Sequence, residues 1–301
     1  MYTKTCRFTS LDDFLTYYYI GMSVLIHEED FEALAWDYFQ HASADGICHT
    51  EVSFDPQAHT TRGISYQTVL SGIQSARLRA ERELGISVEL ISCFVRHLPV
   101  SSALETFEDP VAQEAYSKGI IRGIGLDSSE VEYHPRLYKE LYNKARQMGL
   151  RLTAHAGEEG PAAYIAGALD DLGVERIDHG IRLIEDPVLM RRVADSGVML
   201  TLCPISNVVL KCVQSLSEHP IQKLFKAGVC FSLNSDDPAY FGGYLLENYC
   251  GVQEVVKWGI VEWERICKGA IEKSWCVEER KSVLLDKLKK VVQEFEKSEM
   301  K

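Results

Sequence analysis

Short runs of apolar and β-branched residues alternate along the chain with longer stretches of helical periodicity. Seven runs have the length and composition of buried strands: Ile47–Phe54, Val88–Val95, Ile120–Leu126, Leu150–His155, Arg176–His179, Val198–Cys203 and Val229–Asn234. Helix-like stretches lie between them, among others Tyr66–Leu84, Pro135–Met148, Ala162–Leu172, Pro187–Ser196 and His219–Lys226. This alternation predicts βαβ units built around a parallel sheet.

The ends of the predicted helices and the two ends of the chain fit the same pattern. A glycine stands just before several predicted strands, where a helix commonly stops: Gly85, Gly149, Gly197 and Gly228. The first part of the chain predicts helices, because Leu11, Phe14 and Tyr18 fall at helical spacing. The segment from Glu278 onward predicts a closing amphipathic helix.

The number of predicted strands leaves two architectures open. A closed TIM-type (β/α)8 barrel needs eight strands, and the sequence offers seven. The fold is therefore either an open doubly wound α/β sheet or a barrel that lacks its first strand in this chain. Because no repeat, low-complexity tract or Pro/Gly-rich linker interrupts the sequence, we expect one domain over residues 1–301.

The composition favours a folded protein with a large core and disfavours binding to nucleic acid or to membranes. Hydrophobic residues make up 46% of the chain and charged residues 25%, which is enough for a large core. The formal net charge of −12 disfavours binding to nucleic acid or to an anionic membrane, because like charges repel. A small, nearly neutral substrate is compatible with this charge.

Cysteine usage and the absence of long apolar stretches bear on location. The chain has nine cysteines, none of them in a C-x-x-C pair, and Cys93, Cys203 and Cys230 fall in apolar runs where a free thiol packs as a small hydrophobe. The start of the chain is polar, and no stretch has the length of a membrane span. We expect a soluble protein of the cytoplasm, with the nucleus as a second candidate location beside it.

Polar clusters directly follow four of the predicted strands. They are His155-Ala156-Gly157-Glu158, Asp178-His179-Gly180, Cys203-Pro204-Ile205-Ser206-Asn207 and Asn234-Ser235-Asp236-Asp237-Pro238. Because the carboxyl ends of parallel strands share one rim, where active sites form, we expect these clusters to meet in space.

Each of these residues has an ordinary structural explanation when taken alone. A lone His155 would be a hydrogen-bonded polar residue, Glu158 a first-turn carboxylate, and the pair Asp236-Asp237 a helix N-cap. If all these residues lie together on one rim, the separate structural explanations become weaker. A histidine with an aspartate suits zinc or a similar divalent ion, and an unpaired glutamate beside them suits proton transfer.

Other candidate motifs are weaker. Gly123-Ile124-Gly125 lacks the third glycine of a dinucleotide fingerprint, and no G-x-S-x-G nucleophile elbow occurs. The sequence Asp55-Pro56-Gln57 after the first predicted strand favours a turn over a site.

The four clusters, in this order and spacing, resemble the successive motifs of the adenosine/adenine deaminase family of metal-dependent hydrolases. The similarity runs from about Phe8 to the last predicted helix. Two further stretches, Phe54–Thr60 and Asp236–Tyr244, are similar to the adenine deaminase branch. The second of them brings Tyr240, Phe241 and Tyr244 near the expected pocket.

The resemblance implies a fold, a reaction and a set of roles. It implies a TIM-type barrel that uses one zinc ion to deaminate adenine, a purine, to hypoxanthine and ammonia. His155 and Asp236 would bind the metal, and Glu158 would donate a proton. His179 would orient or deprotonate the attacking water, and Asp237 would hydrogen-bond the purine ring.

The sequence departs from the family pattern at one point. Members of the family begin with a strand that carries a His-x-His pair of metal ligands, and no such pair occurs in this sequence. We therefore expect the chain to lack that strand, to bind metal weakly, to fold poorly and to be nearly inactive alone, unless His49 or His59 replaces the pair.

Two other functions stay open on the sequence. One is deamination of adenosine or an N6-substituted adenine, and the other is a non-catalytic relative that keeps only the fold. The presence of His155, Glu158, His179, Asp236 and Asp237 together disfavours the second alternative.

Overall fold

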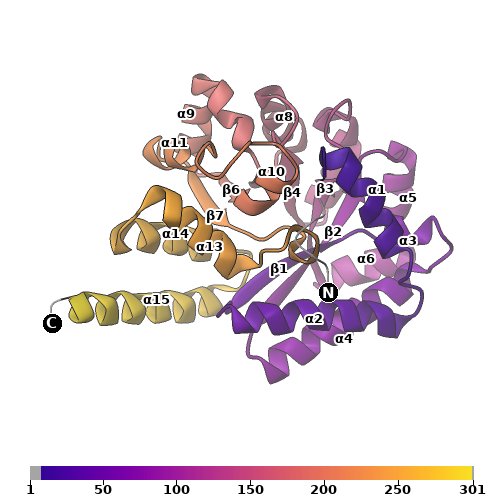
Figure 1. The fold of residues 1–301 in the computed structure, drawn as a ribbon. Coiled ribbons are helices and arrows are strands. Elements are labelled where there is room, and N and C mark those ends of the chain that lie inside the picture. The colour runs from indigo at the N-terminus through magenta and orange to yellow at the C-terminus, as the bar shows by residue number, and fades with distance from the viewer. Residues whose placement is uncertain (1–7, 300–301) are drawn as a thin grey trace.

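Seven parallel strands form one curved sheet in the computed structural model, which describes residues 8–299 (Figure 1). They are β1 (His49–Phe54), β2 (Ser87–Val95), β3 (Ile121–Asp127), β4 (Arg151–Ala156), β5 (Arg176–His179), β6 (Met199–Leu202) and β7 (Cys230–Leu233). Each strand pairs in parallel with the next one along the chain. A doubly wound sheet reverses its strand order, so this steady order excludes that alternative and matches a TIM-type barrel.

Helices connect the strands and precede and follow the sheet. Before β1 lie α1 (Leu11–Met22) and α2 (Glu28–Ala44). Between the strands come α3 (Gln57–Thr60), α4 (Tyr66–Glu83), α5 (Val100–Phe107), α6 (Pro110–Ser117), η1 (Pro135–Tyr138), α7 (Lys139–Gln147), α8 (Ala162–Gly167), η2 (Ala168–Leu172), η3 (Ile181–Glu185), α9 (Pro187–Ser196), α10 (Pro204–Val209) and α11 (Ile221–Lys226). After β7 come α12 (Pro238–Phe241), α13 (Leu245–Val256), α14 (Ile260–Lys273) and α15 (Glu278–Glu299).

The predicted glycine stops are confirmed. Gly197 ends α9 with a φ of 68°, and its N–H bonds to the carbonyl oxygen of Val193. This left-handed conformation carries little cost for glycine, and it turns the chain into β6.

Three predicted helices differ in detail from the structure. The stretch Pro135–Met148 divides into the 3-10 turn η1 and the α-helix α7, and Ala162–Leu172 divides into α8 and the π-helical turn η2. The stretch predicted to start at His219 begins its helix only at Ile221, after Pro220. His219 is thereby left outside the helix and buried.

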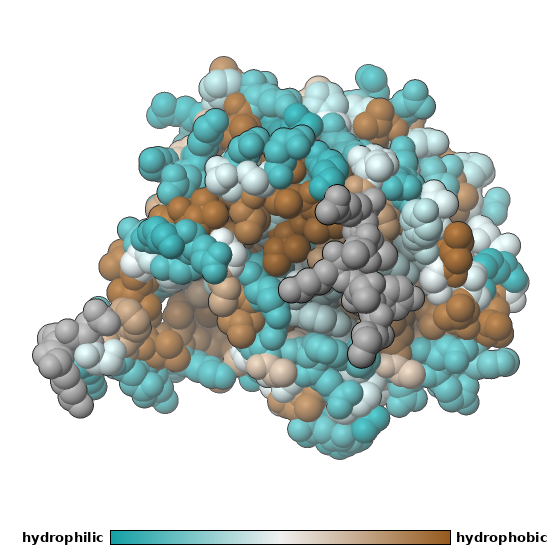
Figure 2. Space-filling view, viewed as in Figure 1, coloured by the Kyte–Doolittle hydropathy of each residue, from teal (hydrophilic) through white to brown (hydrophobic). Residues whose placement is uncertain are grey.

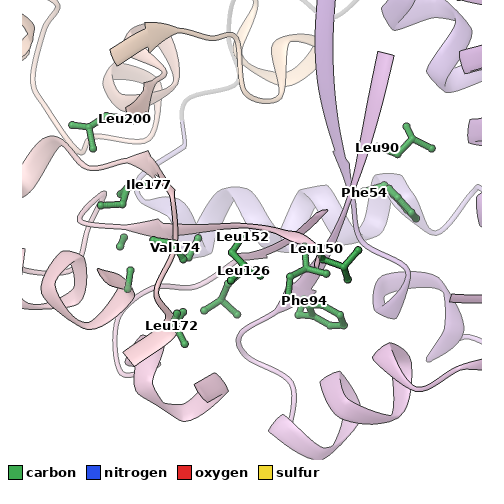
Figure 3. Packing of buried hydrophobic residues seen from close by; sticks show 14 of the residues in the cluster. Phe54, Leu90, Phe94, Leu126, Leu150, Leu152, Leu172, Val174, Ile177 and Leu200 are labelled. Atoms are coloured by element: carbon green, nitrogen blue, oxygen red, sulfur yellow. The ribbon is translucent and has the colours of Figure 1, made fainter. Parts of the chain in front are cut away.

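The main core lies between the sheet and the helices that cover it. Figure 3 shows part of it, in which Leu90, Leu126, Leu152, Ile177 and Leu200 come from five successive strands. All five are buried, and burying a side chain of this size contributes about 1.5–3 kcal/mol. The largely apolar runs seen in the sequence arise because the strands are buried on both faces, by helices outside and by side chains such as Cys93 and Trp275 inside.

The concave inner side of the sheet explains the Gly123-Ile124-Gly125 sequence. A Cβ atom on Gly125 would lie 2.4 Å from Cys93 Sγ, and one on Gly123 would lie 2.7 Å from the ring of Trp275. The two glycines on β3 thus make room for larger side chains inside the barrel.

An ion pair across the inside joins two strands that are not neighbours. Glu51 on β1 contacts the guanidinium of Arg176 on β5, and the Trp275 ring lies 4.1 Å from the Arg176 Cζ atom. The Trp275 backbone N–H donates a hydrogen bond to Glu51. Because β1 and β5 are separated by three strands, this contact requires the sheet to curl strongly.

Helix α1 lies beside the carboxyl ends of the strands. Its Phe14 ring packs against the rings of Tyr240 and Phe241, and the Tyr19 hydroxyl lies 3.1 Å from Ser128 Oγ. In Figure 2, apolar surface gathers in the middle of the face shown, near α10, with polar side chains above and below it. Helix α15 runs beneath α14, against which it packs, and its C-terminal part projects beyond the other elements (Figure 1), as the predicted closing helix.

Two expectations from the sequence concern free thiols and membrane-spanning segments. All eight cysteines in the described part of the chain are free thiols, while Cys6 lies outside it. Within residues 8–299, no helix combines the length and apolar character needed to cross a membrane.

Candidate active site

The structure brings the four polar clusters together at the carboxyl ends of β4 to β7. His155 near the end of β4 and His179 at the end of β5 have ring centroids 4.9 Å apart. The Nε2 atom of His179 lies 3.8 Å from Asp236 Oδ2, in the segment that follows β7.

Glu158 lies at the centre of a buried polar network. Its side chain is almost inaccessible, and Oε1 lies 3.5 Å from His179 Nδ1. The Asn207 amide nitrogen is 3.2 Å from both Glu158 Oε1 and His179 Nδ1, and the Asn207 oxygen is 3.2 Å from His219 Nε2. Burial and the charge of Asp236 raise the pKa of Glu158 well above its usual range, so this carboxyl holds a proton.

His179 lies in the same network, but burial favours its neutral, unprotonated form. Burial lowers its pKa to about 4, although the nearby Asp236 favours the charged form, and the imidazole is therefore neutral at pH 7. His179 and Asp236 have φ values of 62° and 57°, in the left-handed region that non-glycine residues rarely occupy. Such backbone strain is common where a fold holds functional groups in place.

His155 is oriented by a second carboxylate. Its Nδ1 atom lies 3.4 Å from Asp178 Oδ2, which leaves Nε2 as the nitrogen available to a ligand. Asp178 is fixed by hydrogen bonds of 2.7 Å from the hydroxyls of Thr153 and Thr201. Burial lowers the pKa of His155, but Asp178 outweighs burial and raises it to about 10, so this position favours a cation.

The two neighbouring aspartates after β7 differ in their surroundings. Asp236 accepts a 2.6 Å hydrogen bond from the hydroxyl of the buried Ser206. Asp237 precedes α12, but its side chain makes no capping hydrogen bond there. Burial and the charge of Asp236 raise the pKa of Asp237 well above its usual range. Asp237 thus stands at the N-cap position of α12, but its side chain does not cap the helix, so capping does not explain this pair.

The donors at the rim fit a divalent cation. One donor atom from each of His179, Cys203 and Asp236 lies within 4.8 Å of the others, and His155 stands beside His179. Burial raises the pKa of the Cys203 thiol well above its usual range, so it is a poor ligand at neutral pH. Imidazole and carboxylate remain, and this mixture suits a borderline to hard divalent ion.

Two acidic residues of the rim were missed by the sequence reasoning. Asp55, which was predicted to lie in a turn, and Asp127 form a close group with Cys93. Burial raises the pKa of both carboxyls, and for Asp127 the charge of Asp55 raises it further. Asp55 directly follows β1 and Asp127 ends β3, so the rule that found the other clusters would have found these two.

The two histidines considered as replacement ligands lie elsewhere. His49 begins β1, at the opposite end of the strand from the rim, and its Nδ1 is 2.9 Å from Ser87 Oγ. His59 in α3 lies 2.8 Å from Arg62 and packs edge-on against Phe31. Neither joins the polar network described above.

The aromatic residues after Asp237 pack against two different helices, α1 and α2. Tyr240 and Phe241 pack on Phe14 of α1. The Tyr244 ring stacks on His41 of α2, with ring centroids 4.3 Å apart.

The chain is similar in sequence to characterised deaminases over most of its length. A family model described as adenosine deaminase matches residues 1–291. Adenine deaminase of Aspergillus oryzae is 55% identical over 95% of this chain and 82% of its own length. Adenine deaminase of Schizosaccharomyces pombe is 52% identical over 96% of this chain and 79% of its own length.

Solved structures show the same similarity. Adenine deaminase from Arthrobacter aurescens superposes with a TM-score of 0.92 at 42% identity, covering 95% of this chain and 86% of its own. An amidohydrolase from Burkholderia ambifaria, solved with bound Zn, superposes with a TM-score of 0.81 at 26% identity, covering 89% of this chain and 76% of its own.

Proposed function

Because the chain belongs to the adenosine deaminase family, we propose that it hydrolyses adenine to hypoxanthine and ammonia. The observation that carries this proposal is the buried contact of Glu158 with His179, both of which lie within hydrogen-bond distance of the Asn207 amide. An acid and a base side by side suit a reaction that must protonate a ring nitrogen and deprotonate water.

The donor set supports zinc as the divalent ion, with His155 and Asp236 as its ligands in this chain. Zinc at this position would supply Lewis-acid activation of the attacking water. Asp178 supports the role of His155, because a carboxylate on the far nitrogen commonly orients a ligating imidazole. A structural relative that contains Zn supports the choice of metal.

The side chains divide the proton transfers between them. Glu158 donates its proton to the ring nitrogen beside the reacting carbon, and His179 takes a proton from the attacking water. The water oxygen bonds to that carbon as its double bond to the ring nitrogen opens. The exocyclic amine then takes the proton held by His179, the carbon–nitrogen bond breaks as the hydroxyl becomes the ring carbonyl and returns its proton to Glu158, and ammonia leaves. Asp237, whose raised pKa keeps it protonated, donates a hydrogen bond to another ring nitrogen and orients the base.

Formation of the 6-oxopurine product from a panel of purines, measured by chromatography, tests this proposal, because N6-methyladenine would release methylamine and not ammonia. The panel consists of adenine, adenosine and N6-methyladenine, assayed at equal metal loading with a version of the chain that also carries the family's His-x-His strand. We expect kcat/KM for adenine to exceed both others by at least about tenfold, which corresponds to about 1.4 kcal/mol of transition-state discrimination. Equal or faster turnover of adenosine would contradict the substrate assignment while leaving the reaction class intact.

A further inference from the structure

A buried carboxylate outside the reacting groups organises the loop that carries Glu158. Glu130, in the segment after β3, is only 1% exposed. Its oxygens accept hydrogen bonds from four consecutive backbone N–H groups, those of residues 157–160. Three of these donors reach Oε2 at 2.8–2.9 Å, and the fourth, from Gly157, reaches Oε1. A concave row of N–H groups is an anion-binding nest, and here the anion is a side chain of the same protein.

The two glycines of this loop are shaped to receive that carboxylate. Gly157 has a φ of 76°, a conformation that favours glycine. Gly160 allows a close approach, because a Cβ atom there would lie 2.9 Å from Glu130 Cδ. The glycine spacing of the His-Ala-Gly-Glu-Glu-Gly sequence is therefore explained by Glu130.

A buried arginine stands behind Glu130. Arg96 is fully buried, and its Nη1 atom lies 4.0 Å from Glu130 Oε1. Within residues 8–299, no acceptor forms a hydrogen bond with its guanidinium nitrogens. A charge buried in this way is costly unless an opposite charge lies close by. Arg96 and Glu130 therefore depend on each other for charge balance, while the hydrogen-bonding capacity of Glu130 is left to the loop.

We propose that Glu130, with Arg96 behind it, is the positioning residue for Glu158. By fixing the backbone of residues 157–160, it holds the Glu158 carboxyl at 3.2 Å from Asn207 and 3.5 Å from His179. Glu130 acts through this loop, because its own oxygens are occupied by backbone donors. The importance of this for catalysis rests on the proposed function, which makes Glu158 the acid; the nest itself does not depend on it.

The variant Glu130→Gln tests the nest with little change of shape. If the amide oxygen faces the three donors at Oε2, the amide NH2 faces the N–H of Gly157, so donor meets donor. We expect amide hydrogen exchange in a peptide covering residues 157–160 to become at least about tenfold faster, which corresponds to about 1.4 kcal/mol of lost protection. Unchanged exchange there would overturn the proposal.

A matched control separates this local effect from general loss of stability. Glu51→Gln also breaks a buried Glu–Arg pair, that of Glu51 with Arg176, but on the inside of the barrel between β1 and β5. We expect it to lower overall stability without selectively accelerating exchange at residues 157–160. If Glu130→Gln does not yield folded protein, Gly160→Ala crowds the same carboxylate, and also the Tyr164 ring, without removing the charge of Glu130, and is expected to accelerate the same amides.

A double-mutant cycle tests the link to catalysis. We expect Glu130→Gln to lower kcat by about 100-fold, the scale of a catalytic group displaced by about 1 Å. In a Glu158→Gln background the same change should lower kcat by less than about threefold, because the group that it positions is already lost. If Glu130→Gln lowered kcat by the same factor in both backgrounds, the link to Glu158 would be overturned. Failure to deaminate adenine in a version of the chain that also carries the family's His-x-His strand would refute the proposed function, and the exchange experiment would still decide the nest.

Discussion

Replacing Glu51 with glutamine removes one charge from the ion pair that crosses the inside of the barrel. Burial raises the pKa of Glu51, but Arg176, His49 and the Trp275 N–H outweigh burial and lower it from 4.5 to about 2. A carboxyl with a lowered folded-state pKa stabilises the fold above its unfolded-state pKa and loses that contribution as the pH falls. By this linkage, ionised Glu51 contributes about 3 kcal/mol at pH 7.

The mutational cost agrees with this figure. Removing one partner of a buried pair costs about 3–5 kcal/mol, because the other charge is left behind. Arg176 keeps its contact with the Trp275 ring, which offsets part of that cost. We therefore expect Glu51→Gln to lower the free energy of unfolding by about 3 kcal/mol at pH 7. At pH 3, between the two pKa values, about half of this difference should remain.

Equilibrium urea unfolding at pH 7 and pH 3, followed by tryptophan fluorescence and circular dichroism, measures this difference. The control is Glu81→Gln, because Glu81 pairs with Arg77 on the surface of α4 and should contribute less than about 1 kcal/mol. The reasoning would be refuted if Glu51→Gln lost no more stability than this control, or if its effect were the same at both pH values.

Three further changes have expected outcomes. Glu158→Gln should leave the metal content, measured by elemental analysis, nearly unchanged and lower kcat by about 10²–10⁴-fold; loss of the metal would instead make Glu158 a ligand. His155→Ala should lose both metal and ammonia release, and full retention of the metal would exclude His155 as a ligand. Gly125→Ala should lower the urea midpoint by an amount equivalent to about 1–3 kcal/mol, because the new methyl group meets Cys93 Sγ. Adding Cys93→Ala should restore part of that loss, and failure to do so would show that the strain lies elsewhere.

The sheet was predictable from the sequence because its strands are buried on both faces. A strand such as Ser87–Val95 is largely apolar although it contains Glu89 and Ser92, and glycines such as Gly197 mark the helix ends before the strands. The inside of the barrel was not predictable in the same way. The Glu51–Arg176 contact joins strands that are far apart in the chain, and no periodic pattern encodes it.

The candidate site residues could be predicted from the sequence only through one rule, which looks for polar residues directly after a strand. Polar residues that directly follow a strand led to His155, Glu158 and Asp236, and the same rule extends to Asp55 and Asp127. Asp55 was missed because a following proline locally indicates a turn. Its burial depends on how distant segments pack around the rim, which a local pattern cannot show. Glu130 carries no such signal, because its function is visible only through the four N–H groups that meet it.

The balance of charge at the rim links the fold to the proposed chemistry. Carboxyl groups outnumber histidines there, and burial removes the water that would otherwise stabilise their charges. The buried carboxylates can relieve this unfavourable negative charge in two ways: they can hold protons or they can bind a cation. Glu158 and Asp237 hold protons, as their raised pKa values indicate, while His155 with Asp178 favours a cation. The same crowding that would destabilise an apolar core thus keeps a proton on the proposed acid and creates an attractive position for a divalent ion beside it.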